Sequence, residues 1–164
     1  IYEVRLAIEG MATVLVTQRG APPELCRFRG RLERFRNKDD PEAIERMHRV
    51  GWELHDAIVA ATGNRRMRQM YEALRMPIMA LRSGRPVDAA QAHRSLTEHL
   101  AILDAIEAGD ATLAQRRMTD HLAGVLEARV RLSNAGVLAP AAIAPRPAAT
   151  PTEKRQSTAQ KRRG

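Results

Sequence analysis

Three histidines stand on the apolar sides of three different predicted helices, and imidazole is a common protein ligand for zinc and similar cations. They are His55, His99 and His121, each flanked at intervals of three and four residues by apolar positions. Because that spacing returns to one face of a helix, all three side chains should point inward. Three converging imidazoles would hold a metal ion and leave a coordination position open for water or a ligand.

The same pattern leaves three further roles open for these histidines. A single histidine on an apolar face is more often a hydrogen-bonded core residue than a metal ligand, and a helix face predicts direction but not convergence. A three-histidine site with an open position is also the layout of catalytic zinc, so a metal-dependent helical-bundle enzyme is the alternative function. Against it, no further carboxylate or histidine is firmly placed on the inner stripes as a general base. In a third interpretation the histidines hydrogen-bond an organic ligand directly, without a metal.

The elements that must position these histidines are six helices, separated by glycines, prolines and capping residues. Asp40, Asn64 and Asp110 are the expected N-caps of the third, fourth and sixth helices, and Gly63 should end the third in a left-handed conformation. Pro77 should interrupt the fourth helix. Short connections favour antiparallel neighbours, so the predicted fold is all-α, an antiparallel six-helix bundle. Its helices are expected over residues 1–19, 24–37, 41–62, 65–82, 87–108 and 111–134.

The composition is typical of a helical bundle. Aromatic residues make up 3% of the 164 residues, so the core must consist of Leu, Ile, Val, Met and Ala. A single cysteine, Cys26, excludes an internal disulfide and fits a reducing compartment. Because no apolar run is long enough for a membrane span and the first residues do not resemble a signal peptide, we expect a cytoplasmic protein without membrane contact.

The net charge of +8 is concentrated near one end of the chain. Residues 139–164 carry six basic side chains and one acidic side chain, which accounts for +5 and leaves +3 for the remainder. This basic Ala/Pro-rich stretch lacks a periodic apolar face, so we expect a disordered tail after a helical domain of residues 1–138. The nearly balanced charge of the helical part does not indicate a nucleic-acid-binding surface.

A run of motifs along the chain resembles a known family. Residues 98–110 read EHLAILDAIEAGD, and residues 114–122 continue with a spaced Ala and Met and then His-Leu. This is similar to the FCD ligand-binding domain of FadR-type GntR transcription regulators, where E-H-x-x-I-L-x-A-I-x-x-G-D precedes the same spaced residues. Residues 5–9 resemble the family's opening R-x-x-L-E, and residues 54–64 resemble its F-H followed by A-x-G-N. The pieces are specific in combination and cover about residues 1–135.

The resemblance implies an effector-binding domain that follows an N-terminal winged-helix DNA-binding domain, which is expected but absent from this chain. Members of the family bind small organic acids, often through a divalent metal held by one Asp and three His. His55, His99 and His121 fall on the histidine positions, whereas Gly51 stands at the position of the Asp. Because a carboxylate supplies both charge and a ligand, its absence should weaken metal binding, and Gly51→Asp should strengthen it.

Another group could fill the position that the missing carboxylate leaves. A water or the carboxylate of the effector are two candidates. His48 lies on the stripe of His55 but roughly 10 Å away along the axis, too far for easy substitution, although Gly51 leaves space beneath it. Asp56 is a poorer candidate, because an adjacent residue is turned about 100° around the helix.

Two residues near the start of the chain are further candidates for the pocket. Arg5 and Glu9 stand four residues apart and predict an ion pair. The resemblance implies that they face the pocket, where Arg5 would clamp a carboxylate of the effector. Trp52 should instead pack against a neighbouring helix or a dimer partner, away from the histidine face.

The predicted function is therefore that of a ligand-sensing domain, with no enzymatic activity. His55, His99 and His121 are the expected ligands of a divalent metal, zinc first, with nickel or manganese as alternatives. A small carboxylate effector should meet that metal and four further residues, Arg5, Glu9, His48 and Gly51. We expect a homodimer that contacts DNA through the absent N-terminal domain and responds to the effector by a population shift.

Overall fold

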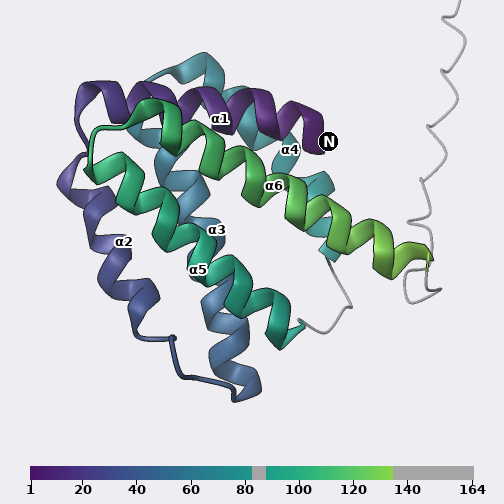
Figure 1. Ribbon diagram of the computed structural model, residues 1–164. Helices are drawn as coiled ribbons and strands as arrows, with labels where there is room; N and C mark the ends of the chain where they lie inside the picture. The colour runs from purple at the N-terminus through teal and green to yellow at the C-terminus, as the bar shows by residue number, and fades with distance from the viewer. Residues whose placement is uncertain (83–87, 135–164) are drawn as a thin grey trace, which may run out of the picture.

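Six helices make up the described part of the chain, residues 1–82 and 88–134 of the computed structural model, and these residues form no strand (Figure 1). The all-α, six-helix prediction is confirmed for these residues. The predicted tail, residues 139–164, lies outside them. The helices are α1 (Tyr2–Arg19), α2 (Pro23–Glu33), α3 (Pro41–Ala61), α4 (Arg65–Arg82), α5 (Ala89–Glu107) and α6 (Ala111–Asn134).

The predicted caps fix the ends of the helices that carry the histidines. Asp40, Asn64 and Asp110 each accept a hydrogen bond from the backbone amide three residues later, at 2.8, 3.1 and 2.9 Å. Gly63 ends α3 with a φ of 65°, a backbone conformation that glycine adopts without steric cost. These capping predictions are confirmed, and they set where α3, α4 and α6 begin or end.

One predicted boundary differs from the structure. The second helix ends at Glu33 and not near residue 37, because the chain tightens there into three-residue turns such as the bond from the Phe35 amide to the Leu32 carbonyl. Pro77 does not break the fourth helix, since α4 continues through it to Arg82, the predicted end. Proline removes one backbone donor, and the next residue, Ile78, is buried against the bundle.

The helices of the bundle pack around one core. Figure 1 shows α6 running beside α1 in the opposite direction, and α5 and α6 forming an antiparallel hairpin. The third helix packs against α1, α2 and α5. Fully buried aliphatic and Met side chains fill the centre, including Leu54 and Ile58 of α3, Leu103 of α5, and Met118 and Leu122 of α6. The histidines therefore project from three helices into one interior.

Among the described helices, none combines the length and the apolarity that crossing a membrane requires.

Candidate metal centre

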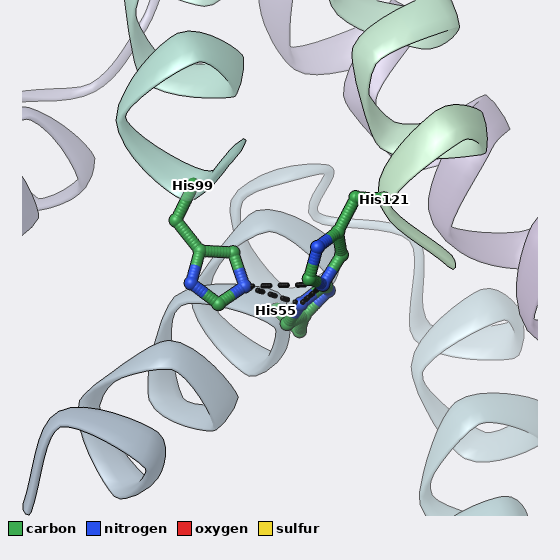
Figure 2. Close-up of side chains that lie close together, drawn as sticks. All are labelled: His55, His99 and His121. Atoms are coloured by element: carbon green, nitrogen blue, oxygen red, sulfur yellow. Dashed lines mark hydrogen bonds between the residues drawn. The ribbon is translucent and has the colours of Figure 1, made fainter. Parts of the chain in front are cut away.

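The three predicted histidines converge. His55 of α3, His99 of α5 and His121 of α6 are buried, and their Nε2 atoms lie 3.1, 3.2 and 3.2 Å from one another. Figure 2 shows the three rings directing one nitrogen each toward a common point. They form a group of potential metal ligands within the described residues. Convergence, which periodicity alone did not predict, is thus a property of the fold.

Two carboxylates determine where the imidazole protons lie. The Nδ1 atom of His55 donates to Oε2 of Glu9 at 2.5 Å, and Nδ1 of His121 donates to Oε2 of Glu98 at 2.7 Å. A neutral imidazole carries one proton, so the Nε2 atoms of both rings present lone pairs. The contact between these two Nε2 atoms therefore cannot be a hydrogen bond. A cation at the common point would turn this repulsion of lone pairs into attraction.

Burial keeps the rings of His55 and His99 neutral. It lowers the pKa of His55 to about 4, although the adjacent Glu9 carboxylate acts in the opposite direction. Burial, followed by the neighbouring His121 and His55, also lowers the pKa of His99 well below its ordinary value. Neutral imidazole is the form that binds a metal ion, so His55 and His99 need no proton release near neutral pH.

The spacing of the Nε2 atoms fits a single ion. At a metal–nitrogen distance of about 2.1 Å, three ligands lie about 3.0 Å apart at right angles and about 3.4 Å apart at tetrahedral angles. The observed separations of 3.1–3.2 Å fall between these limits. Three nitrogens on one side of an ion leave its other side to further ligands. The donor set is therefore suited to a divalent cation with open positions.

Behind His55, Arg5 and Glu9 form a buried ion pair. Arg5 donates to Glu9 from Nε at 2.5 Å and from a terminal nitrogen at 3.2 Å, and both side chains are almost fully buried. Burial by itself raises the pKa of Glu9, but His55 and Arg5 together outweigh it and hold the pKa below its ordinary value. The guanidinium also lies 4.6 Å from the Trp52 ring centre. Arg5 thus orients the carboxylate that orients His55.

A pocket of about 450 Å³, its open mouth included, leads to the histidines. The prediction that Trp52 lies away from the histidine face is wrong, because residues three apart on a helix are neighbours and the indole reaches a ring distance of 6.1 Å from His55. Of the predicted effector residues, Arg5, His48 and Gly51 line this pocket, whereas Glu9 lies behind His55. The full lining is Arg5, Met47, His48, Gly51, Trp52, His55, Ala92, Ser95, Leu96, His99, His121, Val125 and Arg129.

The space expected beneath Gly51 is filled by His99. A Cβ atom added to Gly51 would lie 2.5 Å from Cε1 and 3.0 Å from Nδ1 of that ring. Any side chain at this position, Asp included, would force His99 to move. The absence of the carboxylate at residue 51 is therefore coupled to the observed position of His99.

Two residues of the site do not follow from sequence reasoning. Glu98 stands in the E-H motif beside His99, but its adjacent position turns it toward α6, where it meets His121. The Glu98-His99 pair of the motif was the sequence signal that could have identified Glu98 as a residue of the site. Arg129 follows His121 by eight residues and Val125 by four, spacings that belong to one broad helix face and could have placed it near the histidine side. The contact between Glu98 and His121 cannot be derived without the packing of α5 on α6.

A protein-family model described as FCD domain matches residues 1–124. The chain belongs to the FCD domain family. The match confirms the resemblance drawn from the motifs and identifies the ligand-sensing domain of GntR-type regulators. It covers the three histidines and Gly51, and it ends before Arg129. No curated protein matches the chain.

Proposed function

We propose that this FCD domain senses a small carboxylate through a divalent metal held by His55, His99 and His121. The observation that carries the proposal is the set of converging Nε2 atoms, two of them with lone pairs fixed by Glu9 and Glu98. Imidazole nitrogens favour zinc, with nickel or manganese as alternatives, and the separations near 3.1–3.2 Å are compatible with each.

The pocket supports an anionic ligand. Every ionisable side chain that lines the pocket is a histidine or an arginine. Glu9 and Glu98 lie behind the histidines and do not line it. With no protein carboxylate at residue 51, a carboxylate of the ligand is the natural partner for the remaining positions of the ion. The same lack of a wall carboxylate leaves an enzyme without the usual general base, which favours a sensor over the enzymatic alternative.

The proposed mechanism is a population shift in a regulator. A ligand that bridges the metal and the pocket wall would favour one arrangement of α3, α5 and α6 over another. In a homodimeric, cytoplasmic GntR-type regulator of the FadR kind, that arrangement would set the spacing of the winged-helix domains on DNA. We place the sensing domain at residues 1–138, with residues 139–164 as a basic tail.

Zinc titration with thermal melting tests the metal proposal. We expect the chelator-treated chain to bind one zinc ion and to melt at a higher temperature when zinc is present, because binding to the native state alone raises stability. His99→Ala should abolish this shift, whereas His93→Ala, at a half-buried histidine of the same helix that bonds Asp39, should retain it.

Two outcomes would count against the metal. One is a melting temperature that neither zinc nor chelator changes. The other is a zinc shift that survives in His99→Ala, since that variant lacks one of the three ring nitrogens. Either result would favour a pocket whose histidines hydrogen-bond an organic ligand directly. Circular dichroism of His99→Ala checks that the variant is folded.

A further inference from the structure

His99 differs from the other two histidines at its second ring nitrogen. Nδ1 of His55 donates to Glu9, and Nδ1 of His121 donates to Glu98. The hydrogen-bond contacts that His99 makes with described residues run through Nε2 instead. Figure 2 shows its Nδ1 on the side of the ring that faces away from the other two histidines. The carboxylates therefore fix the proton of two rings, whereas the third ring can carry its proton on either nitrogen.

The Nδ1 edge of His99 lies against α3 at Gly51. A Cβ atom at residue 51 would lie 3.0 Å from this nitrogen, and glycine places no side-chain acceptor beside it. Both residues line the pocket, so a proton on Nδ1 would find its acceptor there, in solvent or in a bound ligand. Nothing on the side of Gly51 thus holds the proton at Nδ1 in the way that the two carboxylates hold theirs.

At Nε2 the neighbours of His99 call for a donor. The lone pairs on Nε2 of His55 and His121 lie 3.2 Å apart, and Nε2 of His99 lies 3.1 and 3.2 Å from these two atoms. Three lone pairs at such distances repel one another, whereas one N–H group among them donates to both neighbours in a three-centre hydrogen bond. For three neutral rings whose carboxylate bonds are kept, only a proton on Nε2 of His99 supplies that donor.

We propose that His99 is the tautomeric switch of the triad, with its proton on Nε2 when no ion is bound and on Nδ1 when one is. The second half of this inference rests on the proposed function. During the change Nε2 gives its proton to water and Nδ1 takes one from water, so the ring stays neutral and releases no proton overall. Nε2 is then free to offer its lone pair to the ion. The pocket gains a hydrogen-bond donor beside Gly51 that is present only in the loaded protein.

Nitrogen NMR of the isotope-labelled, chelator-treated chain tests this inference, because ring nitrogens with and without a proton have well-separated chemical shifts. At about pH 8, where an ordinary histidine is neutral, we expect Nδ1 protons on His55 and His121 and an Nε2 proton on His99. Zinc should move only the proton of His99. His93 is the internal control, since it lies on the same helix and bonds Asp39 through Nε2, and its tautomer should not change.

Several spectra would overturn the inference. One is an Nδ1 proton on His99 in the metal-free chain, and another is an Nε2 proton on His55 or His121. A third is a zinc-loaded chain in which His99 keeps its Nε2 proton, which would refute the switch and leave the metal site standing. If zinc does not bind, the metal proposal fails and the switch fails with it. The metal-free spectrum then decides whether a proton on His99 holds the three rings together.

Discussion

At the scale of single residues, the groups that orient a histidine matter as much as the ring. Glu98 reaches from α5 to Nδ1 of His121 and keeps the proton away from Nε2. Such outer partners typically change metal affinity by 10–100-fold. We expect Glu98→Gln to weaken zinc binding within that range, measured by competition with a chromophoric chelator. Glu127→Gln, at a largely exposed position on α6, is the matched control. Equal affinities in both variants would contradict the assigned role of Glu98.

Gly51 permits the position of His99, so its replacement should disturb the triad. The Cβ atom in Gly51→Ala would lie 2.5 Å from the His99 ring, and the ring must move. We expect zinc affinity to fall by tenfold or more in Gly51→Ala. Gly51→Asp shares that Cβ, so the difference between the two variants isolates what the carboxylate adds. We expect both to bind more weakly than the original chain. Tighter binding by Gly51→Asp would restore the expectation drawn from the sequence.

The low pKa of His55 makes the stability of the metal-free protein depend on pH. An unfolded histidine titrates near 6.5, whereas native His55 titrates at about 4, because burial disfavours the charged ring. Between these values the unfolded chain binds more protons, so the free energy of unfolding decreases as the pH is lowered. The loss should approach about 3 kcal/mol for this group, and His99 acts in the same direction.

Urea unfolding of the chelator-treated chain from about pH 7 to about pH 4.5 measures this dependence. A free energy of unfolding that stays level over this range would mean that the histidines are hydrated or charged in the native state.

The residues of the site were predictable to the degree that their role depends on a single helix. His55, His99 and His121 follow from helical periodicity, and Gly51 follows from the family motif. The contacts of Glu9 and Glu98 join different helices, so they depend on the rotation and register of packed neighbours. Sequence spacing determines neither quantity, which is why Glu98 was missed and Glu9 was expected to face the pocket.

At the scale of helices, local chemistry determines the ends. Caps act within three residues, so Asp40, Asn64 and Asp110 were predicted correctly. The end of α2 and the continuity of α4 through Pro77 depend on packing against the rest of the bundle, which a local signal does not contain. The residues that cap a helix can therefore be predicted from the sequence more reliably than the distance over which the helix continues.

The cap of α6 should contribute measurably to stability. Asp110 accepts a hydrogen bond from the Leu113 amide at 2.9 Å, at the turn that joins α5 to α6. We expect Asp110→Ala to lower the free energy of unfolding by about 1 kcal/mol, since an amide of the first turn loses its partner. Asp120→Ala, on an exposed face of the same helix, should change it by less than about 0.5 kcal/mol. Equal losses in the two variants, measured in urea, would contradict the capping role.

At the scale of the whole molecule, the site joins four helices. The histidines come from α3, α5 and α6, and Glu9 adds α1 through its bond to His55. A ligand bound there acts on helix packing directly, because the side chains that meet it are buried and packed between these helices. This arrangement suits a domain that converts binding into a change of shape.

The distribution of charge predicts that this chain does not read DNA sequence. Residues 139–164 hold +5 of the net +8, and none of the described helices was expected to combine a basic face with a helix-turn-helix pattern. We expect binding to DNA to be weak, independent of sequence and lost at moderate salt, because it would rest on phosphate contacts alone. Titration of specific and scrambled duplexes at two salt concentrations measures this, with a variant lacking residues 139–164 as the comparison. Sequence-selective binding that survives both the deletion and moderate salt would mean that the helical bundle itself recognises bases, and a sensor role alone would then not describe it.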